Sequence, residues 1–207
     1  MTSTPSKADT SYSTLTPVRF LDSPKQKFQN DQLLSCKTRL DTLTNTLLDN
    51  FTKWQTAQKR GQSLCNSIEA IKTKCMENNK TPGGSLFPEE LQPYCDKLAI
   101  IFSVFEDIVK NTKEALRQLT AIAKLQGTGS EIFYRTWFIE DFIDFTKTIL
   151  ERYQAECDVK KFVTEEIAHC RDRCDLIRVS SLWEYPCHVD ERVKLLFLFL
   201  AEELKVK

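Results

Sequence analysis

The hydrophobic positions in residues 31–77 keep an alternating spacing of three and four residues. They run Leu33, Cys36, Leu40, Leu43, Leu47, Asn50, Trp54, Ala57, Gly61, Leu64, Ile68, Ile71 and Cys75, and eleven of these thirteen positions are apolar. A 3.5-residue period held this long is typical of a helix whose single apolar seam faces another helix. At 1.5 Å per residue the helix is roughly 70 Å long, so an unbroken helix predicts an elongated molecule.

A second seam with the same spacing begins at Leu91. It runs Leu91, Tyr94, Leu98, Ile101, Phe105, Ile108, Thr112, Ala115, Leu119, Ile122 and Gln126. The residues between the two seams, from Asn78 to Ser85, contain the strongest turn signal in the chain, and Pro88 suits the first turn of a new helix. The pattern predicts an antiparallel, coiled-coil-like hairpin over residues 28–126, with its turn at about 78–88.

Side-chain volume predicts a register for this hairpin. Pairing residues whose numbers add to about 165 places Gly61 against Phe105, Ala57 against Ile108 and Trp54 against Thr112. Each small side chain then faces a large one, as close packing of a seam requires. The two seams alone bury too little apolar surface to offset the ordering of so many residues, so the hairpin needs a third helix. That helix could come from the C-terminal region or from another chain, and we favour a heteromeric partner.

The C-terminal region, residues 133–207, follows a short linker at 127–132 that contains Gly127 and Gly129. Thr136 could cap a helix at about 137–169, whose aromatic-rich stripe is typical of a protein core. A short helix at 175–183 should end at Tyr185-Pro186, and Asp190 is suited to cap a last helix at 191–205. Because that last helix is apolar on nearly every face, it should lie inside the C-terminal region or in an interface with another chain.

The first 27 residues are rich in Ser, Thr and Pro and poor in large apolar side chains, which predicts a disordered tail. Thr4, Thr16 and Ser23 each precede a proline, so they are candidate sites for proline-directed kinases. Arg19-Phe20-Leu21 has the form of a minimal cyclin-docking motif. The alternative is a solvated leader without such a role. The whole chain is therefore interpreted as an all-α protein: a tail, a long hairpin and a smaller helical region.

Charge and composition limit the classes of function and the cellular settings that we expect for the chain. Lys plus Arg and Asp plus Glu number 29 each, so no global field favours nucleic acid or an anionic membrane. With no signal-peptide pattern and no apolar run long enough for a membrane span, we expect a soluble intracellular protein. In that setting the eight cysteines are better interpreted as reduced thiols than as a disulfide framework.

No known catalytic pattern was found in the sequence, which has no phosphate-binding loop, no serine elbow and no zinc-protease motif. We therefore expect a non-enzyme without a cofactor or bound metal. Two other interpretations are weaker. A zinc site could use His169, Cys170, Cys174, Cys187 and His188, although adjacent ligands on a helix diverge by about 100°. A nucleic-acid face could use Lys160 and Lys161, although acidic residues interleave with them.

From Phe133 onward, a set of residues resembles the cyclin-dependent kinase 2-interacting protein family. They are Phe133, Thr136-Trp137, Leu150-Glu151, Tyr153, Glu156, Lys160-Lys161, Val163, Glu166, Ala168-His169, Trp183, Pro186 and Val189. The resemblance covers about the C-terminal third, and the hairpin agrees with the family in being long and coiled-coil-like.

The resemblance implies a non-enzymatic adaptor, nuclear and in part nucleolar and cytoplasmic. Members of that family are associated with cell-cycle kinases, replication and checkpoint signalling, and with AAA+ ATPases and a related small helical subunit in maturation of the large ribosomal subunit. Buried aromatic residues dominate the energetics of interfaces. We predict partner contacts at Trp137, Tyr153, Lys160, Lys161, Trp183, Pro186 and Phe197. The alternative function is a structural coiled-coil subunit of a tethering or kinetochore-like complex.

Overall fold

The computed structural model describes residues 24–78, 87–126 and 134–205, with side chains placed at 34–77, 87–125 and 134–205. Thr4, Thr16, Ser23 and the cyclin-docking motif lie outside the described residues, as do the linker at 127–132 and most of the predicted turn at 78–88.

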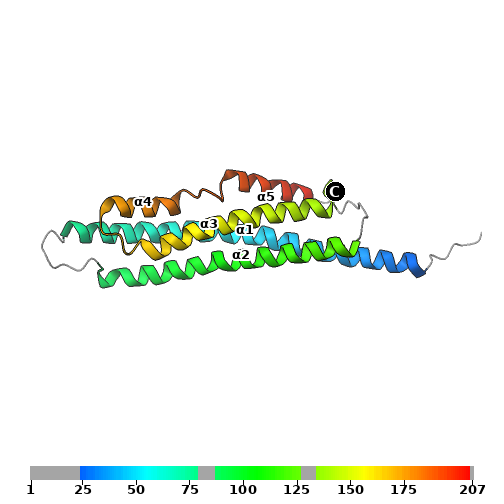
Figure 1. Cartoon of the computed structure of the whole chain (residues 1–207), viewed down its shortest axis with the longest axis horizontal. Helices are drawn as coiled ribbons and strands as arrows, with labels where there is room; N and C mark the ends of the chain where they lie inside the picture. The colour runs from blue at the N-terminus through cyan, green and yellow to red at the C-terminus, as the bar shows by residue number, and fades with distance from the viewer. Residues whose placement is uncertain (1–23, 79–86, 127–133, 206–207) are drawn as a thin grey trace, which may run out of the picture.

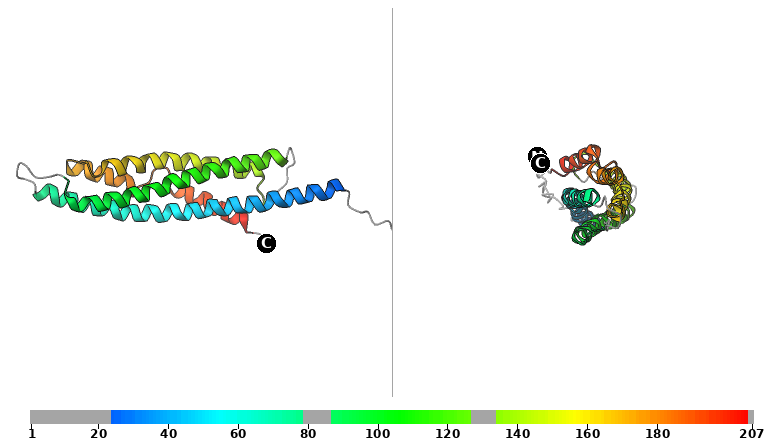
Figure 2. Two further views of the ribbon diagram at one scale, coloured as in Figure 1. Left: turned by 90° about the horizontal axis from the view of Figure 1, so that it is seen from below. Right: turned by 90° about the vertical axis from the view of Figure 1, so that its left-hand side faces the viewer.

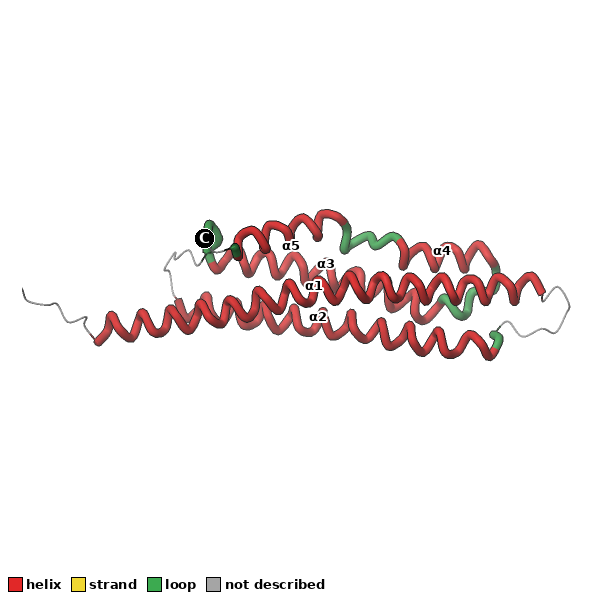
Figure 3. The backbone as a smooth tube through the Cα atoms, turned by 180° about the vertical axis from the view of Figure 1, so that it is seen from behind, coloured by secondary structure: helices red, strands yellow, loops and turns green. Residues whose placement is uncertain are grey.

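The described residues are helical and contain no strand, which confirms the all-α fold class. The helices are α1 (Pro24–Asn78), the 3-10 turn η1 (Glu89–Leu91), α2 (Gln92–Gln126), α3 (Ile139–Glu166), α4 (Arg173–Glu184) and α5 (Glu191–Leu204). Figure 1 shows an elongated bundle in which successive long helices run in opposite directions. The short helices α4 and α5 lie end to end and together take the place of a fourth helix, as the loop between them in Figure 3 makes clear.

The helix α1 is 55 residues long and continues through Gly61 without a break, so it spans about 80 Å. The seam positions of α1 from Cys36 to Gly61 are buried, as predicted. Beyond Gly61 the buried positions are Cys65, Ile68 and Lys72, while Leu64 and Ile71 are only partly buried. Two consecutive steps of four residues, at 57–61–65, shift the buried face around the helix in the manner of a coiled-coil stutter.

The predicted register of the hairpin is wrong by about one heptad. The ring centroids of Trp54 and Phe105 lie 4.5 Å apart, and an Arg39 guanidinium nitrogen donates to the side chain of Gln118 at 3.3 Å. These pairs add to 159 and 157 rather than 165. A shift of seven residues returns the same faces of both helices to the seam, so the hydrophobic spacing could not distinguish the two registers.

The third helix that the hairpin needs is supplied by the chain itself. Helix α3 packs along α2, and Tyr153 of α3 stacks on Trp54 of α1 at a centroid distance of 4.3 Å. Buried residues from α1 to α5 form a single hydrophobic cluster. The preference for a heteromeric partner as the third helix is therefore corrected, because an intramolecular helix occupies that position.

One helix start agrees with the sequence and two differ. The Asp190 carboxylate accepts from the backbone N–H groups of Arg192 and Val193 at the start of α5, as predicted. Helix α4 begins at Arg173, two residues earlier than expected, and its cap, Asp172, was not predicted. Helix α3 begins two residues later than expected, with Asp141 accepting from the Phe138 N–H at 2.8 Å. Thr136 is not its cap, because its N–H and hydroxyl both donate to Glu203 of α5.

Candidate protein-interaction surface

The segment 185–190 separates α4 from α5, the two short helices that together take the place of a fourth helix. Pro186 has no backbone N–H and restricts Tyr185 before it to non-helical conformations, so α4 ends there with Tyr185 at φ −111° and ψ 84°. Asp190 then caps the start of α5. The break gives the two short helices different surroundings and leaves a groove beside α1.

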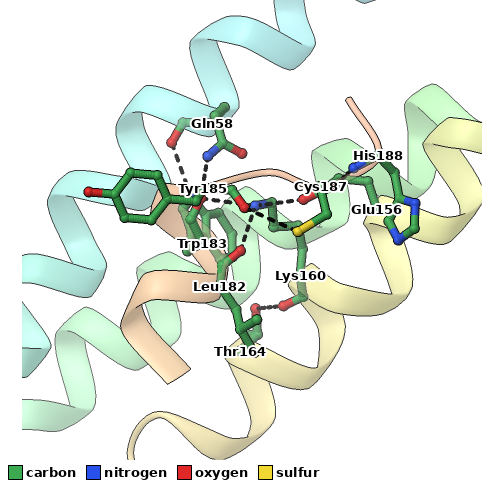
Figure 4. Close-up of polar contacts among 9 residues, drawn as sticks. All are labelled: Gln58, Glu156, Lys160, Thr164, Leu182, Trp183, Tyr185, Cys187 and His188. Carbon is green, nitrogen blue, oxygen red and sulfur yellow. Dashed lines mark hydrogen bonds and ion pairs between the residues drawn. The ribbon is translucent and has the colours of Figure 1, made fainter. Parts of the chain in front are cut away.

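The indole of Trp183, at the end of α4, is held by α1. Its Nε1 donates to the Gln58 carbonyl at 3.1 Å, and the Gln58 amide donates back to the Trp183 carbonyl (Figure 4). Gly61 lies directly under the ring, where an added Cβ would stand 2.0 Å from Trp183 Cζ2. The rule that the smallest seam position faces a large side chain therefore holds, but the large side chain comes from α4 and not from α2.

A buried ion pair on α3 holds the same end of α4. Lys160 Nζ lies 2.9 Å from Glu156 Oε1, with both side chains fully buried, and donates to the Trp183 carbonyl at 3.0 Å. Glu156 accepts from the His188 N–H at 2.8 Å, so the pair links α3 to the end of α4 and to the break itself (Figure 4). We call Gln58, Gly61, Glu156, Lys160 and Trp183 the α4 anchor.

Burial lowers the pKa of Lys160, while the adjacent Glu156 carboxylate acts in the opposite direction. The ammonium also lies 5.1 Å from the Trp183 ring, a distance at which the face of an indole attracts a cation. Buried charges are tolerated when they are paired and hydrogen-bonded, as both are here. Lys160 and Glu156 contact one another, the Trp183 ring and backbone groups of the same chain, so this constellation fixes structure.

The break borders a groove of about 550 Å³ between α1 and the start of α5. Its lining is Phe51, Trp54, Gln55, Gln58, Lys59, Glu184, Tyr185, Pro186, Val189, Asp190, Glu191 and Lys194. Tyr185 is 66% exposed at its edge, and Trp54 is almost completely buried. Concave sites lined by aromatic and apolar groups with a few polar groups at the margin are the usual form of binding sites.

Helix α5 is held on its inner face by aromatic packing and one carboxylate. Phe197 stacks on Phe51 of α1 at 4.1 Å and meets Phe145 of α3 edge-on at 5.4 Å. Glu203 accepts from the N–H groups of Arg135, Thr136 and Trp137 at 2.6–2.9 Å. Burial opposes ionisation of Glu203, but these hydrogen bonds outweigh it and lower its pKa. The outer face of α5 leaves Leu195, Leu198 and Phe199 about half exposed or more.

The predicted contact residues divide into two groups. Tyr153, Lys160, Trp183 and Phe197 are buried in the chain's own core and offer no surface to a partner, which corrects those four assignments. The aromatic character of Tyr153, Trp183 and Phe197 was interpreted as an interface signal, and Lys160 came from the family resemblance, whereas the neighbouring helices already cover all four. Trp137 and Pro186 are partly exposed and Lys161 is exposed, so these three positions remain accessible.

The residues of the suggested zinc site are not brought together. Cys170 precedes α4 and Cys187 follows it, so a 12-residue helix of about 18 Å separates the two groups. Within the described ranges, no group of three or more His, Cys, Asp or Glu is placed to hold a metal ion. The suggested basic face is also divided, because Lys160 points into the core and Lys161 out of it. In the same ranges, no helix combines the length and apolar character of a membrane span.

Sequence reasoning missed Gln58, Gly61 as the seat of Trp183, and the exposed residue Tyr185. It did expect the last helix, with Leu195 and Phe199, to lie in the core or in an interface, and the structure buries one face of α5 and exposes the other. Gly61 and Tyr185-Pro186 did carry signals, as a small residue in a seam and as a helix stop. The contacts of Gly61 and Tyr185 depend on which helix lies next to α1. The local sequence does not predict which helix that is.

Searched against models of known families, the chain has no match. It is similar to curated relatives named cyclin-dependent kinase 2-interacting protein. The human protein is 23% identical over 163 residues, covering 69% of this chain and 77% of the relative. The mouse protein is 22% identical over 164 residues with the same coverage. The alignments are longer than the C-terminal third that carried the resemblance in the sequence, so the likeness extends into the hairpin.

Proposed function

We propose that this chain is a non-enzymatic adaptor that binds other proteins through the groove at the break between α4 and α5. The similarity to proteins named for their interaction with cyclin-dependent kinase 2 supports a role in interactions linked to the cell cycle. The elongated bundle supports the same proposal, because long helices present several separate surfaces along one rigid body.

The finer form of the proposal follows from the family resemblance. We place the chain in the nucleus, including the nucleolus, with some in the cytoplasm. Its proposed partners are AAA+ ATPase subunits and a related small helical subunit, in an assembly linked to maturation of the large ribosomal subunit and to replication. A cell-cycle kinase with its cyclin is a further proposed partner. Direct binding of nucleic acid or membrane is not part of the proposal.

The observation that carries the proposal is the groove with Tyr185 at its edge. Tyrosine is enriched at the energetic centres of interfaces, because it offers a large rigid surface and a polar hydroxyl. Here Tyr185 is largely exposed, yet it lies only two residues after Trp183 of the α4 anchor, and its own N–H donates to the Ser181 carbonyl at 3.0 Å. An exposed aromatic beside a groove that presents both apolar and charged side chains is suited to receive a partner side chain.

The test is native affinity purification of the tagged full chain, with mass spectrometry of the proteins retained in stoichiometric amounts. We compare the natural chain with Tyr185→Asp and with Ile100→Asp, a matched control on α2 that is 65% exposed. We expect AAA+ ATPase subunits and a small helical protein with the natural chain and the control, and their loss with Tyr185→Asp.

Two results would contradict the proposal. If the natural chain retains only coiled-coil subunits, the tethering function takes its place. If Tyr185→Asp retains every partner that the control retains, the groove is not their binding site.

A further inference from the structure

The outer face of α5 carries exposed residues in the spacing of a coiled-coil seam. They are Arg192, Leu195, Phe199 and Glu202, and exposed Leu198 lies beside them. We call these five residues the α5 stripe. It has a cation at its amino-terminal end, large apolar side chains in the middle and an anion at its carboxyl-terminal end.

This clustering sets α5 apart from the other helices. Among the side chains that the structure describes, the other helices each carry their large exposed apolar residues singly or far apart along the helix, as with Leu34 on α1, Phe162 on α3 and Ile177 on α4. Scattered exposure of that kind is ordinary for a protein surface. Three large apolar side chains on one face of a 14-residue helix form a patch, and such patches mark contact surfaces.

We propose that the α5 stripe is a self-association surface, on which α5 of a second copy of this chain packs antiparallel. When residues pair so that their numbers add to 394, Leu195 meets Phe199 of the second copy, and Arg192 meets Glu202 of the second copy. A twofold axis repeats both contacts, so the four seam positions Arg192, Leu195, Phe199 and Glu202 are complementary to their counterparts, while Leu198 lies beside the seam.

Charge selects the antiparallel orientation. A parallel pair would place Arg192 against Arg192 of the second copy and Glu202 against its own equivalent, and both contacts are repulsive. Within the described residues, no ion pair involves Arg192, whereas Glu202 pairs with Lys205 and lies 4.0 Å from Arg135. The Glu202 pair with Lys205 is exposed and three residues apart, so it contributes little and can exchange.

The helix dipole adds a second reason. Arg192 lies in the first turn of α5 and Glu202 in the last turn, and each has the unfavourable sign for its end of the helix. Antiparallel association brings Glu202 of the second copy to the amino-terminal end and Arg192 of the second copy to the carboxyl-terminal end. The added charges then have the favourable signs for both helix ends. Arg192 and Glu202 are unfavourable for the helix dipole in a single chain, but in the dimer each stabilises the helix of the second copy.

The contact is small. A patch from one short helix buries less than the roughly 800 Å² per partner that is typical of stable complexes. Self-association should therefore be weak and depend on concentration. The stripe shares no residue with the lining of the groove, so this inference goes beyond the proposed function and can fail independently of it.

The experiment is sedimentation velocity of the purified full chain over a wide concentration range, with reductant to exclude disulfides through exposed Cys174 and Cys187. The variants are Arg192→Glu, Glu202→Arg and the double charge exchange. The control is Lys113→Glu, a charge reversal at an exposed position on α2. Each single variant creates like-charge contacts twice in the dimer, so we expect its association constant to fall by about tenfold. The double exchange should restore association, and the control should leave it unchanged.

Circular dichroism of each variant serves as the check that the exposed substitution leaves the helices intact. Three outcomes would overturn the inference: a monomer at every concentration, a dimer that is insensitive to charge reversal, or a double exchange that associates no better than the single variants. A different protein that binds the natural chain, and whose binding the single variants abolish and the double exchange does not restore, would also overturn it, because the stripe would then serve that protein.

Discussion

The two halves of the interrupted fourth helix are held in different ways. Helix α4 ends in the α4 anchor, where a glycine, an indole and a buried ion pair fit in one geometry. Helix α5, red in Figure 2, lies along one side of the bundle. It rests on the aromatic contacts of Phe197 and on the Glu203 carboxylate, and it exposes large apolar side chains on its other face. The comparison shows that a residue's type does not reveal its use. Trp183 is buried against other helices of the same chain, whereas Phe199, two residues beyond buried Phe197, is exposed and can contact another chain.

The largest expected effect is at the buried ion pair of the α4 anchor. Lys160→Ala leaves Glu156 charged and without its partner in the core, so we expect a loss of about 3–5 kcal/mol in the free energy of unfolding. Urea denaturation followed by circular dichroism measures it. Lys161→Ala, at the exposed neighbouring position, should change stability by less than about 0.5 kcal/mol.

A second variant separates pairing from packing. Glu156→Gln with Lys160→Met removes both charges and keeps similar volumes, so it should recover most of the loss. If Lys160→Ala is as mild as Lys161→Ala, the ion pair does not hold α4.

The next effect is steric. In Gly61→Ala the new Cβ would stand 2.0 Å from the indole of Trp183. The ring nitrogen and the backbone carbonyl of Trp183 are both hydrogen-bonded, so the ring cannot move freely. We expect a net loss of about 1–3 kcal/mol, although alanine favours a helix over glycine by about 1 kcal/mol.

A double-mutant cycle with Trp183→Leu measures the contact between the two residues. Once the indole is removed, Gly61→Ala should become neutral or stabilising, because only the helix preference remains. Equal costs in both backgrounds would show that Trp183 is not what excludes a side chain at residue 61.

The smallest effect is expected on α5. Glu203→Gln keeps one acceptor oxygen but weakens the charge-assisted bonds to residues 135–137, so we expect a loss of about 1–2 kcal/mol at neutral pH. The pKa of Glu203 is lowered in the folded chain from its ordinary value of 4.5. Its contribution is therefore fully present above pH 4.5 and is lost as pH falls through the lower folded pKa.

Stability measured against pH for the natural chain and Glu203→Gln tests this directly. The difference should be constant at neutral pH and shrink in acid. A difference that persists unchanged in strong acid would mean that the ionised carboxylate does not hold α5.

The sequence by itself determined the helices and several of their ends. The 3.5-residue period predicted α1 and α2, because alternating buried and solvated positions leave a direct trace in residue type. Tyr185-Pro186 and Asp190 predicted the end of α4 and the start of α5, because proline and a capping carboxylate act on the backbone beside them.

Only the tertiary structure decided the register of the hairpin and the use of its aromatic residues. The register is ambiguous by one heptad in the sequence, and the ambiguity is resolved by Tyr153 and Trp183, which pack around Trp54 and Phe105 from helices distant in the chain. Which aromatic residues are buried and which form the outer surface depends on how many neighbours each helix acquires. Helix α4 packs against α1 and α3 and exposes one large apolar side chain, Ile177, whereas α5 exposes three, and no local sequence pattern predicts that difference.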